Sequence, residues 1–389
     1  MKKFNTTGAC IPSRHYMADL TGIVREIGKM ADAGEYIALS RPGKYGKTTT
    51  LNLLRKYLSE EYDVISLDFQ DIGDAGFESE QLFVKAICRL LMKKSANDRR
   101  IPNEIKKQFE DFLGRTEREA ALDELFIAFS EWCTISDKPL VLIVDQVDGA
   151  ADHRVFLDFL AQLRAGYISR ETDDLDTFRS VILAGVRDVR CLKEGVRPGD
   201  QDRSYGPWNI AADCGIDMSL SESGIRAMLE EYEADHKTGM DPAVTAKLLR
   251  EYTNGYPFLV SRICQLMDEG VRRRRELREA WTPAGFDEAV RLLLAEDNTL
   301  FQSLEEVLRD LPELKTPIRD ILMGGTGLTW NWQQAAVSEM HMYGLIRKER
   351  NRAKIANRIF ETLLLSRFLQ DQAQAPEIPE AGKEQAAGC

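Results

Sequence analysis

The sequence contains no long hydrophobic run, few histidines and no cysteine spacing typical of a metal site. A helix needs about 20 consecutive apolar residues to cross a bilayer, and no stretch of the chain approaches that length. The first six residues include no apolar signal core, and the seven cysteines are scattered and odd in number. The four histidines are too dispersed to predict a zinc site. We therefore expect a cytoplasmic protein with neither a membrane segment nor a structural zinc ion.

The composition is that of a globular protein larger than one compact core. The chain has 389 residues, of which 43% are hydrophobic and 30% charged. Acidic residues outnumber basic ones, which gives a formal net charge of −11. That charge argues against a surface built as a whole for nucleic acid, although it is compatible with a local basic patch. We expect two or three domains.

A glycine-containing segment lies between an apolar run at residues 36–39 and a helical pattern that begins at Leu51. Its sequence, residues 41–49, is Arg-Pro-Gly-Lys-Tyr-Gly-Lys-Thr-Thr. A strand, a glycine turn and Gly-Lys-Thr at a helix start are the context of a phosphate-binding loop, because backbone N–H groups and the helix N-terminus surround a phosphate there. We expect Lys47 to reach the β- and γ-phosphates of ATP and the Thr48 hydroxyl to bind Mg²⁺. The predicted nucleotide-binding residues of the loop are Gly43, Lys44, Tyr45, Gly46, Lys47, Thr48 and Thr49.

The loop departs from the usual pattern at its first position. Gly-x-x-x-x-Gly-Lys-Ser/Thr has its first glycine where this chain has Arg41. Gly-Lys-Thr alone also occurs at ordinary strand–turn–helix connections, so a second motif is needed to support the prediction.

That second motif is the apolar run Leu140–Val144, which ends in Asp145. Such a run predicts a strand buried on both faces, and its carboxylate would lie at the C-terminal edge of a parallel sheet, where these sheets bind ligands. We expect Asp145 to hold Mg²⁺ beside Thr48 and to take part in catalysis with Lys47. The two motifs in this order predict nucleotide binding.

The residue after Asp145 is Gln146, where ATPases of this kind usually have Glu. A glutamine orients a water by hydrogen bonding but is not a carboxylate base. Three interpretations stay open: slow hydrolysis in a nucleotide switch, replacement of the missing carboxylate by Asp148, or an introduced Glu-to-Gln substitution that traps the ATP state. We expect hydrolysis to be impaired for the chain as written.

The order of apolar runs predicts an α/β fold with a mostly parallel sheet. Helices are expected near residues 19–33, 78–94, 104–113 and 117–133, and further strands at 63–69, 180–185 and 216–220. Beyond residue 220 the pattern is helical, with helices at 221–236, 241–253, 257–275, 300–311, 317–323 and 334–343. We predict a P-loop ATPase core (1–220), a helical lid (221–297), a winged-helix-like domain (298–370) and a disordered tail (371–389).

Two strands predicted at 344–349 and 353–356 would form a hairpin, the wing of the winged-helix-like domain. Basic side chains there could follow a DNA backbone, in which case binding would weaken steeply with salt. Contact with another protein is the alternative, and the acidic whole chain favours it. The basic residues are Arg347, Lys348, Arg350, Arg352, Lys354 and Arg358.

With these motifs placed, the chain resembles the AAA-like ATPases of the signal-transduction (STAND) and archaeal-type ATPase group, and in particular a bacterial family of AAA-like ATP-binding proteins. The segments that carry the resemblance are 4–16, the phosphate loop, Leu140–Asp148, Ser180–Val186, 207–211, Gly255–Leu259 and 356–360.

The resemblance implies roles for several further residues. It implies a γ-phosphate sensor after residue 185, for which Arg187 is the candidate, and a Gly-x-Pro lid motif that places Pro257 near the adenine. It also implies that segment 4–16 flanks the base, with His15 and Tyr16 as candidates. In this group a neighbouring copy often supplies an arginine, so a homo-oligomer is expected; the candidates are Arg164, Arg170 and Arg190.

Three functional hypotheses follow. The leading one is an ATP-switched protein, binding ATP and Mg²⁺, whose lid and wing domain move with the nucleotide. The second is a nucleic-acid-binding ATPase, similar to an initiator or transposition helper, that uses the wing. The third is a nucleotide-sensing scaffold that never hydrolyses ATP, a hypothesis motivated by Gln146.

Overall fold

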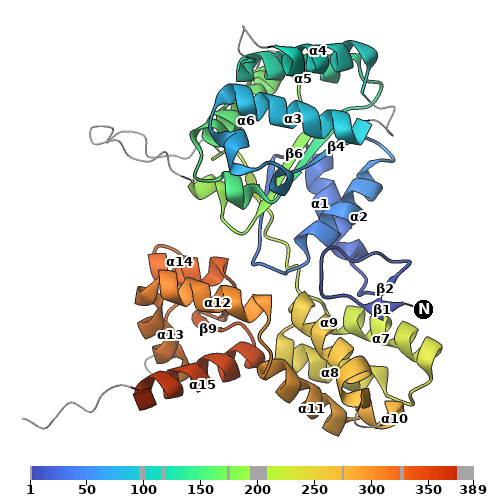
Figure 1. Ribbon diagram of the computed structural model, residues 1–389, viewed down its shortest axis with the longest axis vertical. Coiled ribbons are helices and arrows are strands. Elements are labelled where there is room, and N and C mark those ends of the chain that lie inside the picture. Colours follow the sequence, from blue (N-terminus) through green and yellow to red (C-terminus); the bar gives the residue numbers. More distant parts are fainter. Residues whose placement is uncertain are drawn as a thin grey trace, which may run out of the picture.

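The computed structural model describes residues 2–95, 101–115, 120–172, 176–192, 208–273, 276–324 and 328–374. In Figure 1 the sheet and its helices occupy one end of the molecule, and two helical parts lie side by side at the other. Within the described ranges, no helix has the length and apolar character required to cross a membrane.

A five-stranded sheet forms the centre of the N-terminal part, with the strand order β4-β5-β6-β3-β7 and every neighbouring pair parallel. All residues of β5 and β6 are buried, as expected for apolar runs that are covered on both faces. The prediction of a parallel α/β fold is therefore confirmed. The strands are β3 (Ile37–Ser40), β4 (Asp63–Asp68), β5 (Leu140–Asp145), β6 (Ser180–Gly185) and β7 (Ala212–Asp213).

The strand predicted at residues 216–220 is wrong, because the edge strand is the two-residue β7. The Arg41 guanidinium donates to the carbonyls of Cys214 and Ile216, so these acceptors are satisfied by a side chain instead of a neighbouring strand. Alternating apolar residues in the segment still face inward, with Met218 and Leu220 buried. The alternation reflects packing without strand pairing, because Met218 belongs to the core on one face of the sheet and Leu220 belongs to the core of the lid.

Helices cover both faces of the sheet. The first face packs against α1 (Thr21–Asp32) and α2 (Lys47–Leu58), and Val141, Ile143 and Ile182 contribute from the strands. The other face packs against helices that bring a cluster of phenylalanines onto Leu142, Val144 and Leu183. These strand residues alternate between the faces, which follows the period-two direction of side chains in a strand. The helices on the second face are α3 (Glu80–Ser95), α4 (Asn103–Gly114), α5 (Leu122–Ile135) and α6 (Arg154–Thr172).

The N-terminal segment forms a short parallel pair, β1 (Lys3–Phe4) and β2 (His15–Tyr16), that the sequence did not predict. The pair lies against the helical lid instead of the sheet. The Phe4 and Tyr16 rings lie 5.1 and 5.2 Å from the Tyr232 ring of α7 (Glu222–His236). Segment 4–16 is thereby held beside the lid by aromatic packing.

The lid is a bundle of helices with a core of Leu229, Leu259 and Phe286. The helix predicted at 257–275 ends at Gln265 and continues as a wide π-helical turn over Leu266–Gly270. The lid helices are α7 (Glu222–His236), α8 (Pro242–Thr253), α9 (Pro257–Gln265), α10 (Leu277–Ala280) and α11 (Pro283–Leu294).

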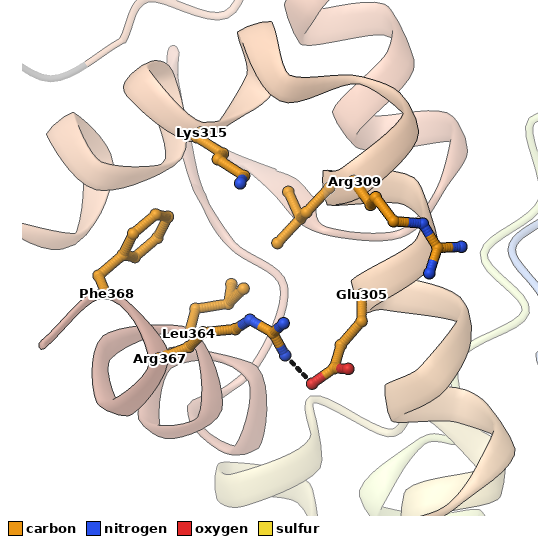
Figure 2. Close-up of a pocket in the computed structure, with 7 residues that line it drawn as sticks. Glu305, Arg309, Lys315, Leu364, Arg367 and Phe368 are labelled. Atoms are coloured by element: carbon orange, nitrogen blue, oxygen red, sulfur yellow. Dashed lines mark hydrogen bonds and ion pairs between the residues drawn. The ribbon is translucent and has the colours of Figure 1, made fainter. Parts of the chain in front are cut away.

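The C-terminal part combines helices with the predicted hairpin, in which β8 and β9 pair antiparallel. Thr329 adds an isolated bridge to Arg352. The hydrophobic core of the C-terminal part is continuous with that of the lid. Arg367 of α15 pairs with Glu305 of α12 (Figure 2). The elements are α12 (Thr299–Asp310), α13 (Lys315–Leu322), α14 (Ala335–Met342), β8 (Ile346–Glu349), β9 (Arg352–Ile355) and α15 (Arg358–Gln374).

The prediction of a disordered tail at 371–389 is wrong for its first four residues, which continue α15 to Gln374. The polar end of this helix extends a segment whose Ile359, Phe360 and Leu364 are buried in the core, and helix propagation is easier than nucleation. Residues 375–389 lie outside the described residues.

Short turns complete the chain: η1 (Phe69–Asp71), η2 (Asp74–Phe77), η3 (Val147–Ala150), η4 (Val189–Cys191), η6 (Val271–Arg273) and η7 (Pro312–Leu314).

Candidate functional site

The phosphate-loop motif connects the C-terminal end of β3 to the first turn of α2. Gly46 has φ of +81°, a left-handed conformation that only glycine adopts readily, and it immediately precedes the helix. Lys47 is 7% exposed, and its Nζ donates to the carbonyls of Arg41 at 2.8 Å and Pro42 at 3.0 Å. The ammonium group therefore lies inside the curve of the loop, where a phosphate oxygen would compete with these carbonyls.

Burial lowers the pKa of Lys47, and the carboxylates of Asp148 and Asp145 oppose that shift. A buried cation with carbonyl partners and nearby carboxylates is suited to a strongly anionic ligand, since such a ligand supplies the charge compensation that water supplies elsewhere.

Thr48 and Asp145 meet directly at this edge of the sheet. The Thr48 hydroxyl donates to Asp145 Oδ2 at 2.7 Å, and the Gln146 N–H donates to Asp145 Oδ1 at 2.9 Å. Asp145 is 6% exposed, and burial raises the pKa of its carboxyl group although both hydrogen bonds act in the opposite direction. A hydroxyl and a carboxylate oxygen are ligands of the kind that Mg²⁺ prefers, and this ion usually takes few protein ligands. The residues fit a magnesium ion that is also held by phosphate.

Gln146 follows β5 in a left-handed conformation, with φ of +60°. Such a backbone costs a residue other than glycine about 1 kcal/mol or more, and strained positions of this kind often lie at functional sites. Gln146 lines the cavity above the loop. Gln146 therefore lies near the predicted magnesium and phosphate sites, but its side chain is an amide and not a carboxylate.

Asp148 does not occupy the role of the Glu that is usual at the position of Gln146. Its Oδ1 accepts from the N–H groups of Val186 and Arg187, both at 2.8 Å, and its Oδ2 also accepts from Val186. These bonds tie the turn after β5 to the end of β6. The carboxylate is engaged in holding this connection, so the structure does not favour Asp148 as the replacement base.

Arg187, the candidate sensor, follows the end of β6, but its guanidinium pairs with Asp152 at 2.7 Å. Its side chain is 42% exposed. The hydrogen bond to Asp152 raises the pKa of Arg187 further above its ordinary value. Only the backbone of Arg187 approaches β3, where its carbonyl accepts from Ser40 Oγ at 3.4 Å.

The absent first glycine of the loop has a structural explanation. Arg41 donates to the Ser40 carbonyl at 2.6 Å and, as described above, to the carbonyls of Cys214 and Ile216. One side chain thereby connects the end of β3 to the segment after β7. Arg41 substitutes for the glycine without pointing into the loop, because its guanidinium is occupied on the sheet side.

The lid contacts the loop through the residues around the Gly-x-Pro motif. A Cβ atom at Gly46 would lie 3.8 Å from the Pro257 ring. The Tyr256 hydroxyl donates to the Gly43 carbonyl at 2.5 Å, and the Tyr256 ring packs edge-on against Tyr45 at 4.8 Å. Lys44 lies over the Phe258 ring at 4.7 Å. The structure therefore brings the predicted lid residue Pro257 onto the loop.

A cavity of about 260 Å³ opens above the loop. The N-terminal segment forms one wall, and the Cys10 N–H donates to Thr49 Oγ1 at 3.0 Å, which joins that wall to α2. Tyr16 lines the cavity, whereas His15 accepts a hydrogen bond from the Ile11 N–H at Nδ1 and is not among the lining residues. Asn5 and Thr6, from the segment 4–16 that was expected to flank the base, also line the cavity. The lining residues that the sequence did not reveal include Met17, Met218, Leu220, Met228 and Ser261.

These missed residues carry no motif. Met218, Leu220 and Met228 have the apolar spacing of ordinary core residues, and only tertiary packing identifies them as a wall. Their apolar and thioether groups provide a surface suited to a flat aromatic base.

The C-terminal part also reaches the loop. A Cβ atom built on Gly344, between α14 and β8, would lie 2.7 Å from Cγ of Pro42. Gly344 itself has φ of +73°. The close approach and the left-handed backbone both require glycine. Core, lid and C-terminal part thus meet at one loop.

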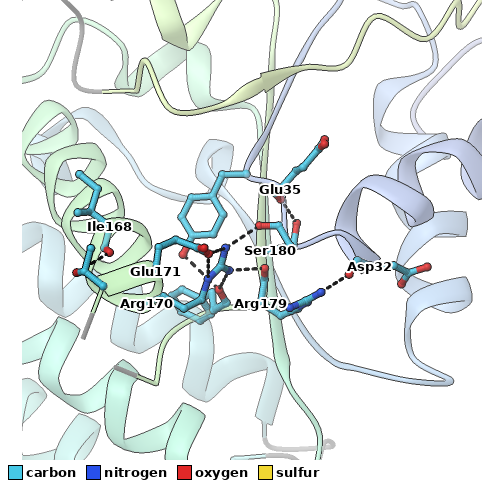
Figure 3. Close-up of polar contacts among 11 residues, drawn as sticks. Asp32, Glu35, Ile168, Arg170, Glu171, Arg179 and Ser180 are labelled. Carbon is cyan, nitrogen blue, oxygen red and sulfur yellow. Dashed lines mark hydrogen bonds and ion pairs between the residues drawn. The ribbon is translucent and has the colours of Figure 1, made fainter. Parts of the chain in front are cut away.

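The three arginines expected as candidates for a neighbour's active site occupy different environments. Arg170 lies at the opposite end of the sheet, where its guanidinium donates to the carbonyls of Gly34, Phe178 and Arg179 at 2.8–3.1 Å (Figure 3). Arg190 forms ion pairs with Asp188 and Asp213. Arg164 is exposed on α6. Arg170 and Arg190 therefore stabilise their own chain, which leaves Arg164 as the accessible one of the three.

The basic residues of the hairpin are partly neutralised. Glu349 pairs with Arg347 at 2.7 Å and with Lys354 at 2.5 Å. Arg358 pairs with Glu251 and stacks over the Tyr252 ring at 4.3 Å, so it connects the C-terminal part to the lid. Lys348, Arg350 and Arg352 have no ion pair within the described part of the chain.

Comparison with known proteins was made on the sequence and on the fold. A profile of the AAA-like domain family matches residues 11–366. No curated protein sequence matches the chain. A Walker-type ATPase of Pyrococcus abyssi superposes with a TM-score of 0.63 at 16% identity, covering 93% of this chain and 99% of that one.

The ORC2 protein of Aeropyrum pernix gives a TM-score of 0.48 at 12% identity, covering 94% and 97% of the two chains. That likeness is too low to support an argument. The superposition on the Walker-type ATPase shows a shared fold along nearly the whole chain.

Proposed function

Because the chain belongs to the AAA-like domain family, we propose that it binds ATP with Mg²⁺ and acts as a nucleotide-dependent switch in which hydrolysis is slow or blocked. The observation that carries the proposal is the convergence of three parts on one loop. Thr48 contacts Asp145 of the sheet, Tyr256 of the lid bonds to Gly43, and Gly344 of the C-terminal part packs on Pro42. A ligand that changes the shape of this loop changes all three contacts.

The proposed binding mode assigns a task to each residue. Backbone N–H groups of Gly43–Thr48 wrap the phosphates at the N-terminus of α2, and Lys47 exchanges its two carbonyl partners for phosphate oxygens. Thr48 and Asp145 hold Mg²⁺, which neutralises phosphate charge when bound. The N-terminal segment and Pro257 enclose the base.

Hydrolysis needs a group that orients the attacking water and accepts its proton. The Gln146 amide orients a water but does not accept a proton, and Asp148 is bonded to the turn after β6. Arg187 would have to leave Asp152 to reach a γ-phosphate. We therefore assign the chain to ATP binding with little turnover, and a scaffold that never hydrolyses ATP is the limiting case.

The test of nucleotide binding is titration of the chain with a fluorescent ATP analogue in Mg²⁺. Lys47→Ala should weaken binding by about tenfold or more, because a charge-assisted contact to phosphate is lost. Lys56→Ala, on the exposed side of the same helix, is the matched control and should bind like the unchanged chain. Equal affinity for all three proteins would contradict the proposal.

We extend the proposal to assembly, with Arg164 of one copy reaching the nucleotide of its neighbour. Light scattering with Mg²⁺ and a non-hydrolysable ATP analogue should show a mass increase that Arg164→Ala reduces. A mass that stays at one copy with and without the analogue would exclude assembly.

A second proposal, contact with duplex DNA through the hairpin, rests on exposed Lys348, Arg350 and Arg352. It requires binding that falls steeply with salt, because each phosphate contact releases counterions. Replacing these three residues by Glu should abolish a shift of labelled duplex DNA at low salt. A chain that causes no shift at low salt excludes the DNA proposal and leaves the ATP switch untouched.

A further inference from the structure

A second hollow lies in the C-terminal part, away from the phosphate loop, between α12, the start of α13 and α15. Its floor is apolar and consists of Leu308, Leu364 and Phe368. Leu308 and Leu364 belong to the hydrophobic core, whereas Phe368 is only partly covered. The floor therefore offers an apolar contact that the chain leaves open to solvent.

The rim of the hollow is charged and predominantly basic. Arg309, Lys315 and Arg367 surround it together with one carboxylate, Glu305, which pairs with Arg367 (Figure 2). Among the described residues, the ion-pair partner of Arg309 is the exposed Asp310 at 3.5 Å, which is a weak contact. This excess of positive charge stands out in a chain whose formal net charge is −11.

Lys315 is the cation best placed to bind a ligand. Figure 2 shows its side chain turned over the hollow, while the Arg309 guanidinium extends outward. Lys315 has no ion pair among the described residues. An ammonium group beside an apolar floor, without an acidic partner, gives a carboxylate an ion pair at low desolvation cost.

The size of the hollow limits what it can hold. Its volume is about 230 Å³ and its apolar floor consists of three side chains, so one large apolar side chain of a ligand matches it. The surface beyond the hollow is also apolar, since Leu365 and Leu369 on the neighbouring stripe of α15 are 39% and 53% exposed. A ligand that also covers Leu365 and Leu369 would have to extend beyond the hollow.

Nucleic acid does not suit this surface. A phosphate backbone needs a row of cations and has no apolar group for the floor, and Glu305 would repel it. A peptide carries both an apolar side chain and carboxylates at fixed spacing, which is how short segments are recognised in grooves.

We propose that the hollow between α12, α13 and α15 docks an acidic peptide segment of a partner protein. One Leu or Phe side chain of the segment fills the apolar floor, and flanking Asp or Glu carboxylates pair with Lys315 and Arg309. The proposal is independent of nucleotide binding, because its residues lie on elements that do not line the phosphate-loop cavity.

The experiment is selection of peptides from a randomised display library on the full-length chain, followed by affinity measurement of the selected peptides by fluorescence anisotropy. Selected sequences should contain acidic residues around a central Leu or Phe. Lys315→Glu should weaken their binding by about tenfold or more, since it replaces attraction by repulsion at the rim. The substitution is tolerable for the fold, because Lys315 is exposed and Glu suits the first turn of a helix.

Arg319→Glu is the matched control, since it makes the same charge change at an exposed residue one helical turn further along α13, outside the hollow. It should weaken peptide affinity much less than Lys315→Glu, because the change lies farther from the peptide's carboxylates and is partly screened by salt. Replacement of the peptide's Leu or Phe by Ser should abolish binding.

Three results would overturn the proposal. The first is selected peptides that lack acidic residues or bind Lys315→Glu as well as the unchanged chain. The second is equal weakening by Lys315→Glu and Arg319→Glu, which would indicate a general charge effect. The third is complete displacement by inorganic phosphate together with undiminished binding of the Ser-substituted peptide, which would indicate an anion site only.

Discussion

Asp145 illustrates how a buried carboxylate lowers the stability of the fold that contains it. Burial raises the pKa of its carboxyl group, so the ionised form is less favourable in the folded chain than in the unfolded one. The sign follows from proton linkage: a raised folded pKa gives stability at pH values below the unfolded pKa of 3.8, and that stability is lost as pH rises through the folded value. At neutral pH the native state therefore carries a buried carboxylate whose desolvation outweighs its two hydrogen bonds.

We predict that Asp145→Asn raises the melting temperature by a few degrees at pH 7.5, because the amide is uncharged, its oxygen still accepts from the Gln146 N–H, and its NH2 group can donate to the Thr48 hydroxyl. The gain should shrink as pH falls toward 3.8, where the aspartate itself becomes neutral. Thermal unfolding of both proteins across this pH range is the measurement, and Mg²⁺-dependent nucleotide binding should be lost in the variant. A gain that does not change with pH would contradict this cause.

Arg170 was expected as a candidate for catalysis in a neighbouring copy, and the structure shows a different environment. Its guanidinium satisfies three backbone carbonyls where β3 and β6 begin, and it stacks on the Tyr167 ring at 4.8 Å. A sequence shows that an arginine lies on a helix, but not which carbonyls another strand brings to it. The same holds for Arg41, whose partners come from residues far along the chain.

We predict that Arg170→Ala lowers the free energy of unfolding by about 2–3 kcal/mol, since buried carbonyls lose a charged donor. ATP affinity should stay unchanged, because the site lies at the other end of the sheet. Arg164→Ala, on the exposed side of the same helix, should leave stability within about 0.5 kcal/mol in urea unfolding. Equal stability of the two variants would contradict the structural task assigned to Arg170.

At the scale of elements, the contact between Thr48 and Asp145 could be predicted, and the cavity wall could not. The order of the motifs places the start of α2 and the end of β5 at the same edge of a parallel sheet, so their contact follows from topology. The N-terminal pair β1–β2 has two-residue strands that leave no periodic pattern. Its position depends on the packing of the Phe4 and Tyr16 rings against Tyr232 of the lid, a contact between residues far apart in the sequence.

The prediction of an edge strand at residues 216–220 was wrong for a related reason. Alternation at 216–220 indicates two differently covered faces, but it does not reveal that Arg41 takes the backbone acceptors that a strand would need. By contrast, the hairpin β8–β9 was predictable, because turn residues separate two short strand-like segments. Its basic residues could be identified from the sequence, but the ion pairs of Arg347 and Lys354 with Glu349 could not.

The turn between α14 and β8 provides a test of the contact between the C-terminal part and the loop. We predict that Gly344→Ala destabilises the chain by about 1–3 kcal/mol more than Gly324→Ala. Both glycines have similar left-handed backbones, with φ of +73° and +69°. At Gly344 the added Cβ would collide with Pro42, whereas at Gly324 no atom of the described residues lies within 4 Å of it.

Thermal unfolding of the two variants separates the strain that they share from the collision that they do not. Gly344→Ala should also change the affinity for the ATP analogue, because Pro42 belongs to the loop, whereas Gly324→Ala should not. Identical stability and affinity of the two variants would mean that the C-terminal part does not restrain the loop.

At the scale of the whole molecule, the phosphate loop is the place where three parts of the chain meet. The sheet supplies Asp145, the lid supplies Tyr256 and Pro257, and the C-terminal part supplies Gly344. The lid and C-terminal part share a continuous hydrophobic core. The proposed switch therefore predicts that a ligand at the loop shifts these two parts together.

The fold class followed from the sequence because strand runs alternating with helices leave few topologies. The meeting of three parts did not follow, since it depends on single contacts such as Gly344 on Pro42 that have no sequence signature. The sequence shows that Gln146 stands where a catalytic Glu is usual, which predicts slow hydrolysis. The left-handed backbone of Gln146 and the hydrogen bonds that occupy Asp148 are seen only in the structure.

The most direct test of a binding switch with blocked hydrolysis is phosphate release by the chain as written, by Gln146→Glu and by Lys47→Ala, in Mg·ATP. We predict that the unchanged chain binds ATP with little turnover. Gln146→Glu should release phosphate about 10²-fold faster or more, because a carboxylate accepts the proton of the attacking water. Lys47→Ala should bind ATP about tenfold or more weakly and release no phosphate above background. Rapid phosphate release by the unchanged chain, equal to that of Gln146→Glu, would contradict the account.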